Sequence, residues 1–397
     1  MAIVIVGAAR TPMGAFQGDF ASLTASQLGA VAIKAALERA GVTPELVDEV
    51  VFGNCLMAGQ GQAPARQATL AAGLPASVGA VTLSKMCGSA MKATMIAHDS
   101  ILAGTNQIVV AGGMESMTNA PYLLPKARGG FRIGHGQVMD HMMLDGLEDA
   151  YHRDEKSGGG RSMGTFAEEC SAHFGFSRAD QDAFAMESVK RAQAATADGS
   201  FAWEIAAVTV KGRTSDVVID RDEGPLKARL EKIPNLKPAF KKDGTITAAS
   251  SSSINDGAAA LVLMDEEMAK KLGLTVLARI VGHATHAQEP EWFSTAPIGA
   301  VNKLLKKIAW SVSDVDLFEI NEAFATVPMA AMKEFSIPHS KVNVHGGACA
   351  LGHPIGASGA RIICTLLGAL RKRGLKRGVA TLCIGGGEAT AMAFELV

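Results

Sequence analysis

The sequence predicts an α/β protein built from two copies of one unit, and three observations lead to this prediction. Buried apolar strands alternate with helical patterns from Ile3 onward, which favours a mostly parallel sheet with helices on both faces. Several apolar runs of the first third recur in the last third at nearly constant spacing. The chain of 397 residues also exceeds the roughly 250–300 residues at which a single core stops growing.

The first copy is expected to alternate short buried strands with longer helices. The strands are expected over 3–6, 49–52 and 107–111, and the helices over 25–40, 65–72 and 87–103. Glycine follows or closely follows each helix, as is typical of helix ends. We expect Gly112-Gly113 to break the third strand.

The last third repeats this plan. Val276–Gly282 resembles the first strand, and Asp314–Glu319 resembles the segment around the second. Val379–Ile384 and the glycines after it resemble the third strand and Gly112-Gly113. Duplication explains the three pairs most simply, although small-residue strand ends look alike in many α/β proteins.

A region of different composition separates the copies. Residues 118–245 are rich in Gly, Met, Pro and charge, and one helix is expected over 178–197, starting at Ser177. The sheet pattern returns over 248–264, with a turn expected at Asn255–Gly257. We therefore expect a first half over 1–117, completed by about 246–270, then an inserted loop domain over 118–245 and a second half over 271–397.

Composition excludes several classes of protein. The net charge of −1 gives no general attraction to nucleic acid or to an anionic membrane, and no apolar run is long enough to span a bilayer. Six cysteines without a CxxC pair argue against a disulfide framework and against structural zinc. His135, Asp140, His141 and Asp145 match no ordinary ligand spacing, so we expect no metal. The N-terminus shows no leader pattern, and we expect a cytoplasmic protein.

Cys87 is the most informative residue. Small residues and then helix formers follow it, which predicts a cysteine in the first turn of a helix. The partial positive charge of a helix N-terminus favours a thiolate, and a thiolate is a nucleophile that can accept an acyl group. An inert buried cysteine is the ordinary alternative.

Three further segments carry reactive side chains. His353 lies between Gly and Pro in a rigid turn, which suits a fixed general base as well as a structural histidine. Cys383 ends a strand before three glycines whose N–H groups can stabilise an oxyanion, and Asn321 follows another strand. A buried strand cysteine and a helix N-cap are the plain alternatives for these two. Together the four residues fit carbon–carbon bond chemistry beside a thioester better than hydrolysis.

With these residues, the chain resembles the thiolase family, and the resemblance runs from Val4 to Ala393. The segments that match the family's motifs are Gly7–Pro12, Met86–Ser89, Asn321–Phe324, Gly352–Pro354 and Cys383–Gly387. The resemblance implies two duplicated βαβαβ halves in a five-layer αβαβα core with an inserted loop domain. It also implies an acylated Cys87, a general base at His353 and proton transfer by Cys383. One oxyanion hole would use a water on Asn321 together with His353, and the other the N–H groups of Cys87 and Gly385.

Coenzyme A is then expected as a substrate, and no cofactor is expected. No P-loop or dinucleotide fingerprint is present, but Lys227–Asp243 is the densest basic stretch of the chain. By resemblance, Lys227, Arg229 and Lys232 meet the nucleotide end, while a solvated surface is the plain alternative. The pantetheine and acyl positions are expected at Met163, Phe240, Ala248, Ser252, Ala323 and Phe324.

The predicted function is acetyl-CoA C-acetyltransferase, with a 3-ketoacyl-CoA thiolase of longer substrates as the alternative. The loop 151–162 is longer than in short-chain biosynthetic members. Ser162 falls where those members often carry His, and Glu388-Ala389-Thr390 stands where many have Gln-Gly. These departures bear on chain length. A carrier-dependent condensing synthase would carry a histidine at Asn321, and a non-catalytic lipid binder would lack Cys87 or His353. We expect a homo-oligomer, either a dimer or a tetramer.

Overall fold

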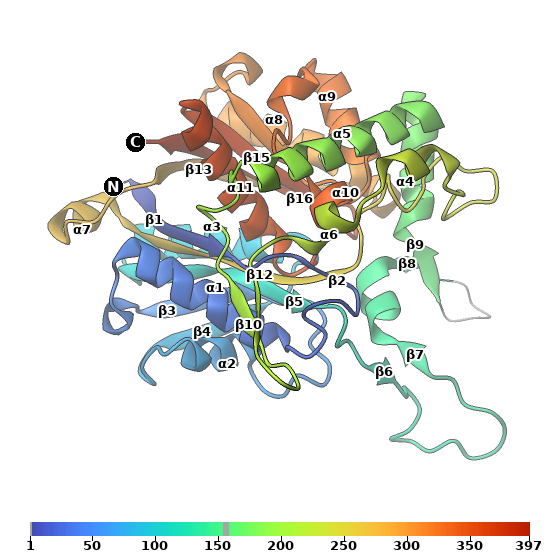
Figure 1. Cartoon of the computed structure of the whole chain (residues 1–397), viewed down its shortest axis with the longest axis horizontal. Helices are drawn as coiled ribbons and strands as arrows, with labels where there is room; N and C mark the ends of the chain where they lie inside the picture. Colours follow the sequence, from blue (N-terminus) through green and yellow to red (C-terminus); the bar gives the residue numbers. More distant parts are fainter. Residues whose placement is uncertain (1, 154–158) are drawn as a thin grey trace.

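The fold centres on one ten-stranded mixed sheet, seen in Figure 1. The computed structural model describes residues 2–153 and 159–397. The strands of the sheet are β1 (Ile3–Arg10), β2 (Gly14–Ala15), β3 (Glu49–Gly53), β4 (Gly79–Leu83), β5 (Ile108–Ser116), β12 (Asn255–Asp265), β13 (Ala278–Ala287), β14 (Leu317–Ile320), β15 (Arg377–Ile384) and β16 (Glu388–Leu396). Their order is β14-β15-β16-β13-β1-β12-β5-β3-β4, with β2 beside β12.

This order confirms the duplication. Outward from the centre, β1, β12, β5 and β3 on one side match β13, β16, β15 and β14 on the other. The strands that look alike in sequence therefore occupy equivalent places. Within the described sheet, the strands of the two halves pair through β1 and β13, over Val4↔Arg279 and Ile5↔Ala278.

The expectation of a mostly parallel sheet is wrong. Only β3 with β4, β3 with β5, and β14 with β15 are parallel neighbours, and the other pairs in the sheet are antiparallel. The cause is one strand in each half that runs against the rest. β12 lies between β1 and β5 and runs antiparallel to both. β16 likewise lies between β13 and β15 and runs antiparallel to both, so each of these strands forms two antiparallel pairs.

The predicted turn at Asn255–Gly257 and the predicted break at Gly112-Gly113 are also wrong, since both segments lie inside strands. These glycines are there for close packing. A Cβ on Gly112 would lie 2.1 Å from the Ala259 carbonyl oxygen, and one on Gly113 would lie 2.0 Å from the Gly356 carbonyl oxygen. Any side chain would therefore push apart the neighbouring strand or the loop around Gly356.

Helices complete the fold. They are α1 (Ala25–Ala40), α2 (Pro64–Ala71), α3 (Ser89–Leu102), α4 (Met163–Phe174), α5 (Arg178–Ala197), α6 (Glu223–Lys227), α7 (Glu266–Lys271), α8 (Ala296–Ile308), α9 (Thr326–Phe335), α10 (Ala348–Leu351) and α11 (Ser358–Arg373). Shorter helical turns are η1 (Pro44–Leu46), η2 (Met143–Leu147), η3 (Leu230–Asn235), η4 (Pro290–Thr295), η5 (Val312–Asp314) and η6 (His339–Lys341). Among the described residues, no helix combines the length and the apolar character that crossing a membrane requires.

The helices and the sheet form five layers, as expected. α3 and α11 pack against each other between the two halves of the sheet, and their apolar faces share one core with the strands on both sides. α1 and α2 cover the outer face of the first half, where a second core forms. α8 and α9 cover the outer face of the second half over a third core.

The region between the halves contains α4, α5 and α6 with three small strand pairs. The pairs are β6 (Tyr122–Leu123) with β7 (Met139–Asp140), β8 (Glu148–Arg153) with β9 (Gly160–Ser162), and β10 (Val208–Val210) with β11 (Val217–Ile219). Ser177 is the N-cap of α5, in agreement with the predicted start, and its side chain also forms a capping box with Asp180. α4 packs against α9, and α5 against α10, so both lie over the C-terminal half. Residues around β6 and β7 project from the body as an arm (Figure 1).

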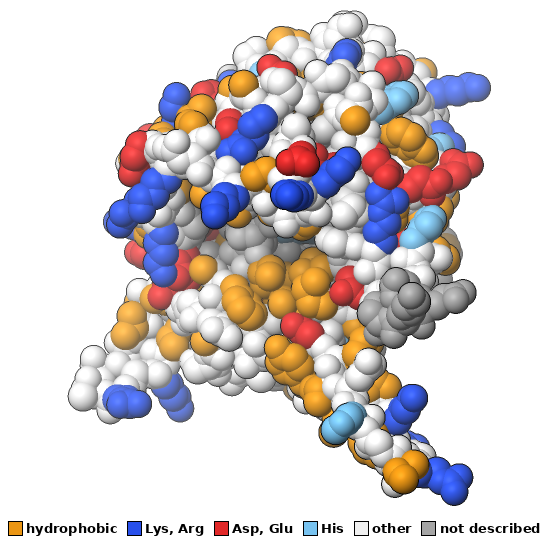
Figure 2. Space-filling view, turned by 90° about the vertical axis from the view of Figure 1, so that its right-hand side faces the viewer, with side chains coloured by type: hydrophobic (Ala, Val, Ile, Leu, Met, Phe, Trp, Pro, Cys, Tyr) orange, Lys and Arg blue, Asp and Glu red, His pale blue; other side chains and the backbone are white. Residues whose placement is uncertain are grey.

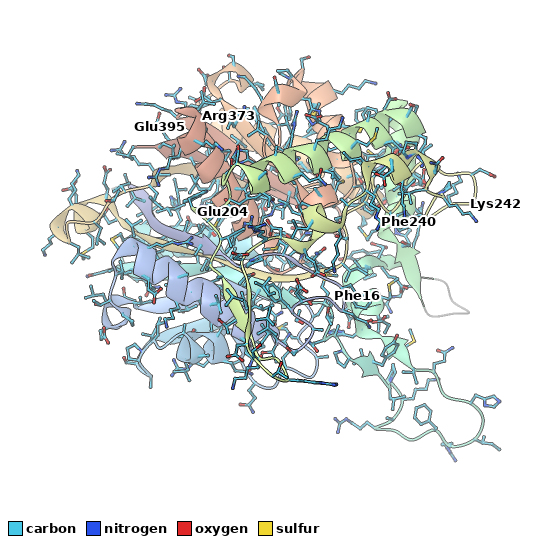
Figure 3. The ribbon with its side chains drawn as sticks, in the orientation of Figure 1. Phe16, Glu204, Phe240, Lys242, Arg373 and Glu395 are labelled. Carbon is cyan, nitrogen blue, oxygen red and sulfur yellow. The ribbon has the colours of Figure 1, made fainter. Side chains whose placement is uncertain are left out.

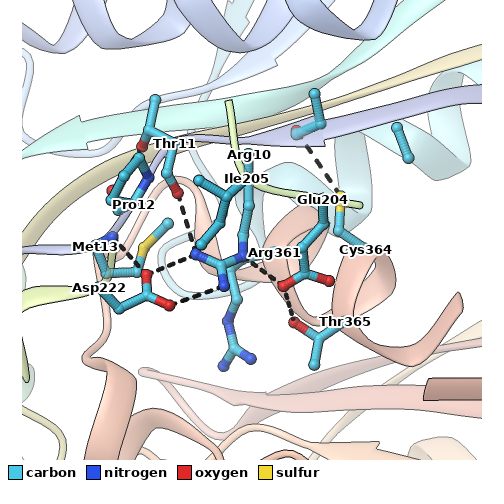
Figure 4. A network of polar contacts seen from close by, with 12 residues as sticks. Arg10, Thr11, Pro12, Met13, Glu204, Ile205, Asp222, Arg361, Cys364 and Thr365 are labelled. Atoms are coloured by element: carbon cyan, nitrogen blue, oxygen red, sulfur yellow. Dashed lines mark hydrogen bonds and ion pairs between the residues drawn. The ribbon is translucent and has the colours of Figure 1, made fainter. Parts of the chain in front are cut away.

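A buried ion-pair network ties this region to β1 (Figure 4). Arg10 is fully buried, and its guanidinium bonds Glu204 at 2.6 Å and Asp222 at 2.6 and 2.9 Å. Burial opposes the charge of Arg10, but the Asp222 and Glu204 carboxylates outweigh burial and raise its pKa. Removing Arg10 would leave two buried carboxylates without their cationic partner, at a cost of roughly 3–5 kcal/mol.

Candidate active site

Cys87 lies in a tight turn between β4 and α3. The helix begins at Ser89 with Gly88 as its N-cap, so Cys87 stands just before the first turn rather than within it. The Ser89 hydroxyl closes the turn, since it accepts from the Lys85 backbone N–H at 2.8 Å and donates to the Met86 carbonyl at 2.7 Å. Met86 has a φ of 45°, an unusual conformation for a residue with a side chain. The local sequence thus fixes the direction of the Cys87 side chain.

The expected thiolate at Cys87 is not what the surroundings favour. Burial raises the pKa of the Cys87 thiol to about 11, although hydrogen bonds from the N–H groups of Gly385 and of Cys87 itself act in the opposite direction. Desolvation therefore outweighs these two hydrogen bonds. A thiol with this pKa needs a base that removes its proton during attack.

His353 has the properties of such a base. Its Nδ1 lies 2.5 Å from the Ser358 hydroxyl oxygen, and that hydroxyl donates its own proton to the Pro354 carbonyl at 2.9 Å. Ser358 must then accept from Nδ1, which places the ring proton on Nδ1 and leaves Nε2 as a free acceptor. Nε2 is buried and has no hydrogen-bond partner. Burial, with a smaller effect of Arg361, lowers the pKa of His353 to about 3, so the ring is neutral near neutral pH.

Cys383 lies near the end of β15 and is completely buried. Burial raises the pKa of its thiol well above the usual value, and the neighbouring sulfur of Cys87 raises it further. The interaction between the two cysteines confirms that segments almost three hundred residues apart in the sequence meet here. Cys383 holds its proton at neutral pH and can donate it to a carbanion.

Asn321 follows directly after β14, as predicted, and its backbone N–H donates to the Thr381 carbonyl at 3.0 Å. Its side chain is 1% exposed, and both amide atoms lack a protein partner. The neighbouring Glu322 fixes the loop, because it accepts hydrogen bonds from Ser188, Asn343 and the Cys349 N–H at 2.7, 2.8 and 3.0 Å. The amide of Asn321 is thus held in place with its hydrogen-bonding capacity free.

A cavity of about 500 Å³ brings these elements together. Of the residues predicted for catalysis or binding, those that line it are Cys87, Met163, Phe240, Ser252, Ala323, Phe324, His353 and Gly385. Asn321 and Cys383 are buried behind this surface. In Figure 2 hydrophobic side chains gather in a hollow, and lysine and arginine side chains lie on the surface above it.

The predicted coenzyme positions divide into two groups. Phe240 packs edge-on against Phe324 at 5.7 Å and lies over Gly164, where a Cβ would come within 2.2 Å of its ring. Lys242, from the same loop, points away from the body (Figure 3). The predicted contacts that lie outside the cavity lining are all exposed; they are Lys227, Arg229, Lys232 and Ala248. Lys227 already forms an ion pair with Glu223.

The methionines of the inserted region divide between the cavity and the core. Met143 and Met163 line the cavity, whereas Met142 is buried in a small core with Leu56 and Met117. Tyr151 and Ser162 of the loop 151–162 also line the cavity, and residues 154–158 of that loop lie outside the described residues.

Two functional contacts were not predicted. Ser358 orients His353, and its position five residues after the histidine in a Gly- and Ala-rich stretch was the available signal. Glu115 is buried at the end of β5 and accepts from the N–H groups of Cys55, Leu56 and Gly356 at 3.0, 3.1 and 2.9 Å. It thereby holds the loop after β3 against the loop that carries His353. Burial raises the pKa of Glu115 to about 7.

The four residues considered for a metal form no common cluster among the described residues, where His141 instead bonds Asp145 at 2.7 Å. A different group does converge: the Asp99 carboxylate accepts from His98 at 3.0 Å and from His283 at 2.9 Å. None of these three side chains lines the cavity.

Comparisons with known proteins agree with this geometry. The family model "Thiolase, N-terminal domain" matches residues 3–267, and "Thiolase, C-terminal domain" matches residues 274–396. Acetyl-CoA acetyltransferase 2 of Arabidopsis thaliana is 52% identical, over 100% of this chain and 97% of the relative. Acetyl-CoA acetyltransferase of Cupriavidus necator is 48% identical, over 99% of each.

Two solved structures resemble the whole chain. The acetyl-CoA acetyltransferase of Bacillus anthracis superposes with a TM-score of 0.96 at 41% identity, covering 100% of this chain and 99% of the other. The Acat5 thiolase from Ascaris suum in complex with coenzyme A gives a TM-score of 0.92 at 40% identity and covers 100% of both chains. The similarity spans both halves, and the resemblance found in the sequence is confirmed: the chain belongs to the thiolase family.

Proposed function

We propose that this protein is an acetyl-CoA C-acetyltransferase, an acyltransferase that interconverts two acetyl-CoA molecules with acetoacetyl-CoA and CoA. The names of its relatives and the arrangement around Cys87 support this proposal. The observation that carries it is the free Nε2 of His353 in the lining of the same cavity as Cys87, a thiol that burial keeps protonated. A neutral base and a protonated nucleophile are the pair that acyl transfer requires.

Thiolysis begins at the 3-keto carbon of acetoacetyl-CoA. Cys87 attacks this carbon while its proton passes to His353 Nε2, and the oxyanion is held by the N–H groups of Cys87 and Gly385. The carbon–carbon bond then breaks, and its electron pair forms the enolate of acetyl-CoA. The Cys383 thiol protonates the enolate carbon, and the first acetyl-CoA leaves. The other acetyl group, from the 3-keto end of the substrate, remains bound to Cys87.

The second half of the reaction releases the acetyl group. The proton on His353 passes to the Cys383 thiolate, which restores both residues. His353 next accepts the thiol proton of CoA as the CoA sulfur attacks the acetyl carbon. The bond to Cys87 breaks, His353 returns the proton to the Cys87 sulfur, and a second acetyl-CoA is released. Asn321 and His353 polarise the thioester carbonyl during enolate formation, and condensation is the reverse of these steps.

Coenzyme A enters this scheme as a substrate. We assign its pantetheine arm to the channel beside Phe240 and Ser252, and its phosphates to Lys227, Arg229 and Lys232 on the surface. We further propose a homo-oligomer that uses the projecting arm, where Tyr122 is 70% and Ile133 99% exposed. Such apolar exposure is typical of subunit contacts. The cytoplasm remains the expected compartment.

The proposal is tested by thiolysis of acetoacetyl-CoA with CoA, in the wild type and in the Cys87→Ser variant. We expect turnover in the wild type and its loss in the variant, with CoA affinity retained. Cys349→Ser is the matched control, since Cys349 is also half-buried but does not line the cavity. Six- to ten-carbon 3-ketoacyl-CoA substrates complete the test. A strong preference for them would replace the proposed activity with that of a longer-chain thiolase.

A further inference from the structure

An ion pair joins the two loops that meet at the Cys87 sulfur. The Lys85 ammonium bonds the Glu388 carboxylate, although the residues are 303 positions apart and belong to different halves of the fold. Their side chains are 24% and 37% exposed, so both charges are partly withdrawn from water. Neither residue lines the cavity.

Each partner belongs to a segment that positions a reactive group. Lys85 begins the turn around Cys87, and its carbonyl accepts from the Gly88 N–H at 3.0 Å. Glu388 is the first residue of β16, directly after Gly385–Gly387. Gly386 and Gly387 have φ angles of 90° and 82°, which only glycine adopts readily. The Gln288 N–H bonds the Gly387 carbonyl at 2.9 Å and so ties this turn to its own half of the fold, whereas the ion pair of Glu388 ties it to the other half.

These contacts close a ring across the site. Starting at Cys87, the ring runs through the hydrogen bond from the Gly385 N–H, along the glycine turn to Glu388, across the ion pair and back through Lys85. The ring contains both the Cys87 and the Gly385 N–H groups. Those are the two donors that the proposed function assigns to an oxyanion hole, and such donors act only when they are correctly placed.

We propose that Lys85 and Glu388 are positioning residues that hold the Cys87 turn and the glycine turn at the separation catalysis requires. This inference rests on the proposed function for its effect on turnover. Its effect on the Cys87 thiol does not depend on that function, because the Gly385 N–H contacts the sulfur whatever the substrate is. An isolated surface ion pair would contribute little, but this pair is partly desolvated and joins loops from the two halves of the fold.

The test compares Glu388→Gln, Lys85→Met and the charge-exchanged double variant Lys85→Glu/Glu388→Lys. We expect kcat for thiolysis to fall roughly tenfold in each single variant with KM changed less than twofold, and to recover at least half in the exchange. The matched control is the exposed pair Glu267 and Lys270 of α7, where Glu267→Gln and Lys270→Met are expected to leave kcat unchanged. Thermal unfolding of all variants excludes a general loss of structure.

A second measurement follows the pH dependence of Cys87 alkylation by iodoacetamide, with the modified residue identified by peptide mass spectrometry. Loss of the Gly385 contact would shift the profile of both single variants toward higher pH. A purely electrostatic effect would move them in opposite directions, because one variant removes a negative charge and the other a positive charge.

The two measurements separate failure of this inference from failure of the proposed function. Unchanged kcat with an unchanged alkylation profile in both single variants would overturn the positioning role. Opposite shifts in the alkylation profile would overturn it as well. An inactive wild type whose variants still show the common upward shift would refute only the acetyltransferase activity.

Discussion

Replacing Ser358 with alanine tests the assignment of the proton on His353. The Ser358 hydroxyl accepts from Nδ1 at 2.5 Å while it donates to the Pro354 carbonyl. Without that acceptor, nothing holds the proton on Nδ1, and a ring that carries it on Nε2 cannot take a proton from Cys87. The expected defect is therefore in the chemical step rather than in substrate binding.

The magnitude follows from the burial of the pair. His353 is 7% exposed and Ser358 is fully buried, so water does not replace the lost acceptor. Leaving a buried N–H without a partner costs about 1–3 kcal/mol. If keeping the proton on Nδ1 without this acceptor costs about 2 kcal/mol, kcat falls about thirtyfold.

Steady-state thiolysis of acetoacetyl-CoA over a range of CoA concentrations measures this effect. KM is expected to stay within about twofold of the wild type, because Ser358 does not line the cavity. Ser171→Ala is the matched control. Ser171 is also buried and donates to a carbonyl four residues earlier, at 3.0 Å, but within the described residues its hydroxyl bonds no histidine. Full activity in Ser358→Ala, or an equal loss in Ser171→Ala, would refute the proton assignment.

Three further predictions concern other groups of the site. Cys383→Ala is expected to slow α-proton exchange on acetyl-CoA at least roughly a hundredfold while Cys87 still becomes acetylated, as measured by NMR and mass spectrometry. Neutralising Lys227, Arg229 and Lys232 together is expected to raise KM for CoA roughly tenfold at low salt and less at high salt, with kcat unchanged. For His353 the folded pKa of about 3 lies below the ordinary 6.5, so its contribution to stability is lost as pH falls from 6.5 toward 3. Between pH 7 and 4.5 the free energy of unfolding of His353→Gln is therefore expected to fall by roughly 2–3 kcal/mol less than that of the wild type. Urea unfolding at both pH values measures this difference.

Each of these predictions has an outcome that contradicts it. Normal proton exchange in Cys383→Ala would assign the transfer to another group. A KM for CoA that is the same in the triple variant as in the wild type at low salt would show that the basic stretch does not meet the phosphates. Parallel stability curves for His353→Gln and the wild type would mean that His353 titrates normally in the folded protein.

The reactive residues were predictable because they lie in short segments whose chemistry is local. The glycines around Cys383 and the Gly–His–Pro turn each constrain the backbone within a few residues. The strand ends before Asn321 and around Cys383 were predicted for the same reason. Apolar periodicity likewise gave α1 and α5 with the observed bounds.

Properties that depend on distant segments were not predictable. The antiparallel course of β12 and β16 depends on which strands become neighbours, and periodicity carries no information about direction. The prediction of a thiolate at Cys87 considered the nearby helix end but not the burial created by the second half of the fold. Gly112 and Gly113 were taken for a strand break because the closeness of Ala259 and Gly356 cannot be read locally.

The most direct test of the central claim is the intact mass of the protein after incubation with acetyl-CoA alone. Cys87 beside a neutral His353 predicts one added acetyl group, located on Cys87 by peptide mapping and removed when CoA is added. Protein that stays unmodified, or that carries the acetyl group on any other cysteine, would contradict the account.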